Sequence, residues 1–215
     1  MKNKLLIVAL LFFCWGFSSC VSFIDTRKMN LDANNTSDKI LNLKYAGDAD
    51  EILAAAAEKM VKNGFLNSHE EEYGYYDVRY EVDTQSGNFR GIMLYIPILW
   101  VAPLLGVPTG VSQFHLTAHF YVFDSNGIIV KHYSNSKDYN QVFGLYYQNG
   151  YATKKGAKEF SQLFNAIFDE AARDSAAINE ALRQAGPVSG NSSITEVQAS
   201  IDRFFRENPY AQNSR

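Results

Sequence analysis

Cysteine is nearly absent from this 215-residue chain, which has only Cys14 and Cys20, both within its first 20 residues. The body of the chain therefore has no thiol with which to form a disulfide, ligate a metal ion or attack a substrate. A domain without disulfides depends on its hydrophobic core for stability, and the residues that follow position 19 are numerous enough to build one such core.

Clusters of basic residues are also absent. Once Lys2 and Lys4 are removed with the N-terminal segment described below, 18 basic and 23 acidic residues remain, a net charge of −5. A mildly acidic domain without a basic patch is a poor partner for nucleic acid or for anionic lipid headgroups. The content of apolar residues, 47%, and of charged residues, 20%, is that of an ordinary globular protein.

The motifs of well-known catalytic and metal sites are missing too. There is no Gly-x-Ser-x-Gly, no glycine-rich phosphate loop, and no second histidine after His69-Glu70-Glu71-Glu72 at the spacing of a metalloprotease. His115 and His119 lie on a predicted strand, where four residues span about 13 Å, too far to share one ion. We therefore predict no catalytic residue, no metal site and no cofactor. A triad assembled in space from dispersed Ser, His and Asp residues stays open.

The first twenty residues have the order of a secretory signal. Lys2 and Lys4 are followed by the uncharged run Leu5–Phe17, then by Ser18, Ser19 and Cys20. A membrane-spanning helix needs about 20 apolar residues, so this run is too short to be a permanent anchor.

Phe17-Ser18-Ser19-Cys20 resembles the lipobox of bacterial lipoproteins, with Phe17 where Leu is usual. The resemblance implies that the Cys20 thiol is lipidated and that Cys20 becomes the mature N-terminus. Acyl chains such as palmitate would then hold the protein stably on a membrane face. Val21, in place of Asp, implies sorting to the outer membrane rather than retention in the inner membrane. The alternative is an ordinary cleaved signal peptide followed by a chance cysteine.

The domain organisation follows from composition. Residues 1–19 are predicted to be the signal peptide, and residues 20–38 a polar, flexible tether that spans roughly 25 Å. Residues 39–210 are predicted to form a single domain. There are no internal repeats.

Hydrophobic periodicity predicts the elements of this domain. Strands are expected at 41–45, 73–83, 89–96, 113–122 and 128–133; a loop at 134–150; and helices at 48–62, 153–186 and 194–208. Asp124-Ser125-Asn126-Gly127 is a turn sequence that should join two strands in a tight hairpin. We predict an α+β fold, with an antiparallel sheet of about five strands and helices packed on one face.

The run Ile92–Val111 carries no charge over twenty residues and contains three of the chain's five prolines. Proline breaks helices, which argues against a membrane-spanning segment. Two interpretations stay open: a buried connection between hairpins, or an exposed apolar loop that contacts a partner or dips into a bilayer. In the second case the contact candidates are the apolar and aromatic residues Tyr95, Trp100, Leu104 and Leu105.

Two tyrosine clusters could form a stacking surface for a sugar or a peptide. Their candidate residues are Tyr73, Tyr75, Tyr146 and Tyr147. Such residues are equally consistent with ordinary strand and rim aromatics.

In element order, the domain is similar to small auxiliary lipoproteins of bacterial envelope transport and assembly systems. The resemblance implies a lipid-anchored, non-enzymatic binding, adapter or scaffold module in the cell envelope. Its partners would be the membrane, through the N-terminal lipid, and an envelope protein. Two alternatives stay open: a periplasmic hydrolase without a recognisable motif, and a carrier of a small apolar ligand or lipid.

Overall fold

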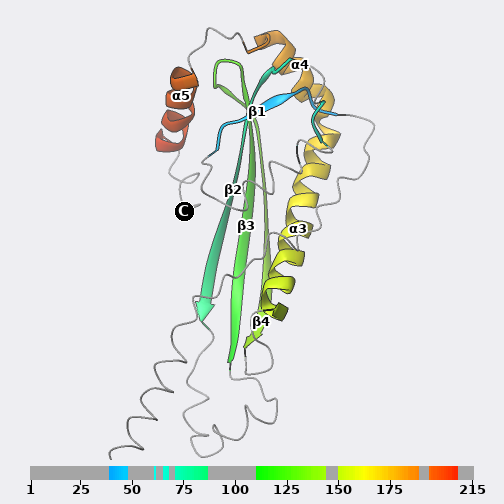
Figure 1. Cartoon of the computed structure of the whole chain (residues 1–215), viewed down its shortest axis with the longest axis vertical. Helices are drawn as coiled ribbons and strands as arrows, with labels where there is room; N and C mark the ends of the chain where they lie inside the picture. The colour runs from blue at the N-terminus through cyan, green and yellow to red at the C-terminus, as the bar shows by residue number, and fades with distance from the viewer. Residues whose placement is uncertain are drawn as a thin grey trace, which may run out of the picture.

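The computed structural model describes residues 39–47, 61, 65–67, 71–86, 110–143, 150–188 and 194–207. Its elements, in chain order, are β1 (Leu43–Tyr45), β2 (Gly74–Ser86), β3 (Gly110–Asp124), β4 (Ile129–Phe143), α3 (Gly150–Arg173), α4 (Ser175–Ala185) and α5 (Ile194–Glu207). The predicted α+β class is confirmed. Figure 1 shows three long strands side by side, with α3 running alongside them.

The prediction of an antiparallel sheet of about five strands is wrong. The described part of the chain forms a four-stranded mixed sheet in the order β1-β2-β3-β4, in which β1 pairs parallel with β2. A long connection, from Tyr45 to Gly74, separates these two strands. Such a crossover allows parallel pairing, whereas a short turn forces antiparallel pairing. The predicted strand at 89–96 and the predicted helix at 48–62, apart from Val61, lie outside the described residues.

The hairpin between β3 and β4 forms at the predicted turn. One carboxylate oxygen of Asp124 accepts hydrogen bonds from the backbone N–H of Asn126 (2.8 Å) and of Ile128 (2.9 Å). Gly127 has φ of +75°, a conformation that glycine adopts without steric cost. The turn therefore fixes the register of the whole hairpin.

The prediction of a loop over residues 134–150 is wrong for 134–143, because β4 continues to Phe143, and for Gly150, where α3 begins. Residues 144–149 lie outside the described residues. We predicted a loop at 134–143 because many residues of β4 are polar. Tyr133 and Tyr139 supply its buried contacts, and the side chains between them that face away from the core remain solvated. A strand needs only every second side chain in the core. Fifteen extended residues give β3 and β4 a length of about 50 Å.

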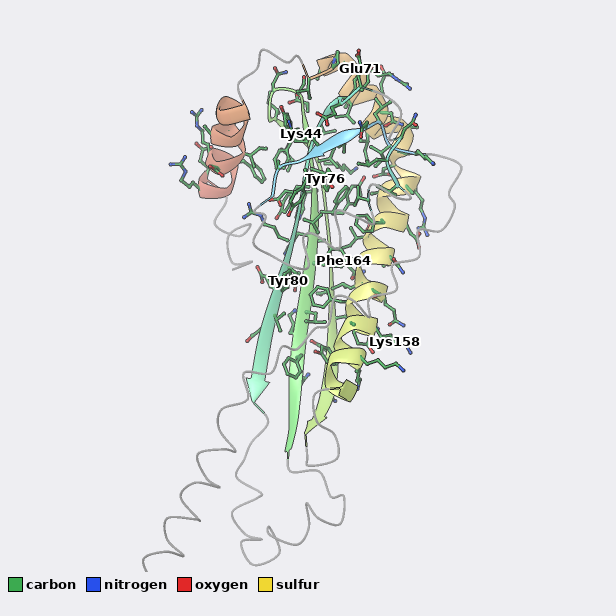
Figure 2. All side chains as sticks on the ribbon, in the orientation of Figure 1. Lys44, Glu71, Tyr76, Tyr80, Lys158 and Phe164 are labelled. Atoms are coloured by element: carbon green, nitrogen blue, oxygen red, sulfur yellow. The ribbon has the colours of Figure 1, made fainter. Side chains whose placement is uncertain are left out.

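The main hydrophobic core lies between the sheet and α3 with α4. The apolar stripe predicted for the long helical segment is confirmed as buried: Phe160, Leu163, Phe164, Ile167, Phe168, Ala171, Ile178 and Leu182. Figure 2 shows Phe164 between α3 and the strands. On the sheet, the stripe meets Tyr76, Phe120 and their neighbours on the same face.

This helical segment is not one helix, as predicted, but two. α3 ends at Arg173 and α4 begins at Ser175. The carboxylate of Asp174, at the break, accepts a hydrogen bond from the Tyr133 hydroxyl (2.9 Å) and pairs with the Lys131 ammonium (3.0 Å). These contacts tie the break to β4. The predicted stop is confirmed, since α4 ends at Ala185 and Gly186 has φ of +83°.

The prediction that the helices share one face of the sheet is also wrong. Consecutive strand residues point to opposite faces, and Tyr76 belongs to the core under α3 whereas Tyr75 belongs to a second cluster. That second cluster contains Tyr121, Phe123 and Ile201 of α5, with Phe204 packed against it. The apolar side of α5 packs on the three aromatic side chains of the second face and removes them from water.

Candidate functional site

Most of the predicted contact residues cannot be placed. Those that lie outside the described residues are Cys20, Tyr95, Trp100, Leu104, Leu105, Tyr146 and Tyr147. The described residues nevertheless show where the segment with Trp100 is attached to the fold.

The segment 87–109 leaves the sheet and returns to it at the same end. β2 ends at Ser86 and β3 begins at Gly110, and the ladder between these strands runs without interruption from Gly74↔Asp124 to Ser86↔Ser112. Twelve residue steps separate Gly74 from Ser86, about 40 Å at 3.3–3.4 Å each. The chain that carries the charge-free run therefore leaves β2 and enters β3 at the end of the sheet opposite the Asp124–Gly127 turn. We call the end with this turn the head and the end at Ser86 the tip.

The described chain enters the domain at the head. The side chain of Asn179 in α4 accepts a hydrogen bond from the Leu41 N–H (2.8 Å) and donates one to the Lys39 carbonyl (3.0 Å). β1 then pairs with the first three residues of β2. In Figure 1, β1 and α4 lie together at one end of the long strands.

The two tyrosine candidates in the described residues pack against the cores. Tyr75 is 3% exposed and lies in the second cluster, where burial, with the nearby charge of Glu72, raises its pKa. Tyr73 packs against the main core, and its backbone N–H donates to the Asn42 carbonyl (2.8 Å). Tyr75 is thus a core residue rather than a surface ring. A stacking surface at Tyr146 and Tyr147 stays a prediction.

The structure reveals a polar cluster on the second face that the sequence did not single out. The carboxylate of Asp77 is only 2% exposed and accepts a hydrogen bond from Arg79 Nε at 2.7 Å. The backbone of Gly47 passes close to this carboxylate, since a Cβ atom at that position would clash with Asp77 Oδ1 and with the Tyr45 hydroxyl. Asp77 therefore helps to hold the segment that follows β1 against β2.

Two histidines meet beside this ion pair. Nδ1 of His119 and Nε2 of His132 are 3.1 Å apart, a hydrogen bond between β3 and β4. His119 is 9% exposed, whereas His132 reaches solvent. The ring of His132 lies flat on the ring of Tyr121, with centroids 4.3 Å apart and planes at 4°. We call these two residues the histidine pair.

The surroundings disfavour charge on both histidines. Burial lowers the pKa of His119, and the Arg79 guanidinium lowers it further. Burial also lowers the pKa of His132, and so does its neighbour His119. Burial raises the pKa of Tyr121 to about 12, so its hydroxyl is neutral at ordinary pH. Of the three ring side chains, the two histidines are therefore the ones whose charge can change at mildly acidic pH.

Beyond the histidine pair, towards the tip, the second face is open to solvent. Its cross-strand rows include Asp83, His115 and Asp138, with His115 Nδ1 2.5 Å from the Asp138 carboxylate. His115 and Asp138 are 49% and 60% exposed. His115 contacts Asp138, whereas His119 contacts His132. Among the residues that the structure describes, no three His, Cys, Asp or Glu side chains are grouped to hold a metal ion.

None of the helices in the described ranges is long and apolar enough to cross a membrane.

Comparisons with known proteins add little. No family model and no curated protein matches the chain. Among solved structures, the chain is similar to a minor lipoprotein from Acinetobacter baumannii, with 15% sequence identity and a TM-score of 0.28. The match covers 69% of this chain and 91% of that chain. At this TM-score the similarity carries no argument about fold or function.

Proposed function

We propose that this protein is a lipid-anchored protein of the bacterial cell envelope that acts as a non-enzymatic binding or adapter module. The lipid is attached at Cys20, in the outer membrane. The contact surface is the charge-free run at the tip, with Trp100 at its centre and Tyr95, Leu104 and Leu105 beside it.

The observation that carries this proposal is the separation of the two ends of the domain. The chain arrives from the Cys20 side at the head, where Lys39 and Leu41 bond to Asn179. The chain that carries the charge-free run leaves β2 and enters β3 at the tip, about 40 Å away along β2. A tether of eighteen residues spans roughly 25 Å as a coil. The domain is thus long enough to present its tip well beyond the anchoring membrane.

This arrangement favours a protein partner over the anchoring bilayer as the target of the tip. A loop that dips into the same bilayer would need the domain to fold back along its tether. An apolar surface at the far end of three long strands is instead typical of a module that spans a gap between a membrane and another envelope component.

A photocrosslinking amino acid at Trp100, used in living cells, tests the proposal. The matched control carries the same amino acid at Ile128, which is 62% exposed in the hairpin turn at the head. We expect a protein adduct from position 100 that position 128 does not give. Lipid adducts from position 100 would mean that the tip enters a bilayer. Crosslinks only within the chain would place Trp100 in a buried connection and refute the proposed surface.

The anchor has a separate test. Cys20→Ala removes the sulfur that accepts the lipid, so a larger, unlipidated precursor should accumulate, and intact-protein mass spectrometry measures it. Cys14→Ala is the control, because Cys14 lies within the segment predicted to be removed. An unchanged mature mass in Cys20→Ala would show that Cys20 is not lipidated.

A further inference from the structure

The histidine pair can carry two or three ring protons without losing its hydrogen bond, but not four. A hydrogen bond between His119 Nδ1 and His132 Nε2 needs one N–H and one lone pair. Each neutral imidazole carries one N–H, so one of the two facing nitrogens donates and the other accepts. A first extra proton can sit on the donating ring without breaking the bond. A second extra proton puts an N–H on both facing nitrogens and two positive charges side by side.

The position of the pair makes this second proton costly. His119 is buried, and no hydrogen-bond partner for its Nε2 atom is found among the described residues. Arg79 adds a third positive charge nearby. His132 reaches solvent, so protons arrive there first. The pair therefore accepts its last proton only by separating.

Among the described residues, the side chains whose charges act on His119 and Tyr121 lie on β2. On β2, Arg79 opposes protonation, while Asp77 and Glu81 on the same face act on the neighbouring Tyr121. α5 presents Ile201 and Phe204 to this region. The charged residues of α5 whose side chains the structure describes are exposed: Asp202, Arg203, Arg206 and Glu207. No described carboxylate other than the Arg79-bound Asp77 is as buried as His119.

Ring contacts connect the pair to α5. His132 covers Tyr121 at 4.3 Å, and the ring of Phe204 meets Tyr121 at 6.1 Å and Phe123 at 5.9 Å. Ser200 Oγ of α5 also donates a long hydrogen bond, 3.5 Å, to the Gly127 carbonyl in the hairpin turn. α5 therefore packs mainly on the aromatic patch formed by Tyr121 and Phe123, and the histidine pair lies at the edge of this patch.

We propose that the histidine pair is a proton-operated latch, and that its double protonation loosens α5 from the second face of the sheet. At neutral pH the pair is closed and holds His132 flat on Tyr121. At acidic pH the two histidine rings separate, and the His132 ring moves away from its stacked position on Tyr121. Phe204 then packs less well against the aromatic patch.

The direction of the effect follows from the lowered pKa of both histidines. A histidine in the unfolded chain has a pKa of about 6.5, and the open pair resembles it. Above that pH neither the open nor the closed pair binds an extra proton, so the latch keeps its full strength. As the pH falls below about 6.5, the open state binds more protons than the closed one, and closure weakens until the pH passes the lowered pKa values of the folded state.

Amide hydrogen exchange in the whole protein, corrected for the intrinsic pH dependence of exchange, tests the latch. We expect the protection of α5 amides to fall about tenfold between pH 7.5 and pH 5.0, while amides of α3 keep theirs. His132→Gln replaces the ring by a neutral amide that can still donate to His119 Nδ1, so the fall should become several times smaller. His115→Gln, on the same face of β3 but outside the pair, is the control and should respond like the unchanged protein.

Equal α5 protection at both pH values, or a His132→Gln variant that responds as strongly as the His115→Gln control, would overturn the proposal. Nitrogen NMR of the imidazole rings adds a test that needs no variant. The latch predicts one N–H between His119 Nδ1 and His132 Nε2 at pH 7.5 and a coupled, two-step titration. Two independent titrations at the ordinary value would refute it.

Discussion

Alternate residues of the same long strands form the two faces of the sheet, yet the two faces differ in the side chains that they carry. The face under α3 is apolar on β2 and β3, from Tyr76 and Phe120 to Phe114, and these side chains form the main core. The face under α5 changes along the sheet: an aromatic patch at the head, the histidine pair and the Asp77–Arg79 ion pair next, and solvated side chains towards the tip. The first face fixes the fold, whereas the second carries groups that can respond to solvent.

The largest effect should come from the first face. Phe164→Ala removes a ring that is 1% exposed and lies against Phe160 and Phe168, so it should lower the free energy of unfolding by about 3–5 kcal/mol. Denaturant unfolding measures it. Lys158→Ala is the control on the same helix, because Lys158 points away from the sheet (Figure 2) and should change stability by less than about 0.5 kcal/mol. A loss below about 1 kcal/mol in Phe164→Ala would mean that α3 does not form the main core.

A smaller effect is expected under α5. Ile201→Ala removes a side chain that is 1% exposed, but the cluster around it is small, so we expect a loss of about 2 kcal/mol. Thermal unfolding measures this loss, and hydrogen exchange should show it confined to α5 and the head. Arg203→Ala, on the exposed side of α5, should leave stability nearly unchanged. If both variants behaved alike, α5 would not pack on the second face.

The smallest effect should come from the link between β4 and the break in the helical segment. Tyr133→Phe removes the hydroxyl that donates to Asp174, at a cost of about 1 kcal/mol. Denaturant unfolding measures this loss. Burial raises the pKa of Tyr133, and the hydrogen bond to Asp174 raises it further. Tyr139→Phe, on the same face of β4, is the matched control, and a loss there as large as in Tyr133→Phe would show that Asp174 contributes nothing specific.

The sequence predicted best what periodicity encodes. The stripe of α3 and α4, the alternation of β2 and β3 and the turn at Asn126-Gly127 depend on local spacing, and all are found in the structure. The parallel pairing of β1 was missed because strand direction depends on the path of a long connection. The full length of β4 was missed because Ser134, Asn135 and Ser136 resemble a loop unless the partner strand beside them is known.

The histidine pair was missed for a related reason. His119 and His132 are thirteen positions apart, and only the register set by the hairpin turn and the irregularity between Val122 and Phe123 brings their rings together. The alternation of β3 puts His119 on the face opposite Phe120. The sequence could not show that α5 covers part of that face, because the pattern of a strand does not indicate which face is covered by a helix far away in the sequence.

The central claim is that the anchor and the contact surface lie at opposite ends of the domain. The most direct test is to measure the distance of each end from the membrane. Because Cys20 would carry the lipid and no other cysteine follows it, a dye can be attached at Asp83→Cys near the tip or at Ile128→Cys at the head, both exposed positions. Energy transfer from each dye to acceptors in the membrane would be measured in the lipidated protein on vesicles. We predict that the tip dye lies farther from the bilayer than the head dye, by up to about 30 Å. A tip dye as close to the bilayer as the head dye, or closer, would contradict the account.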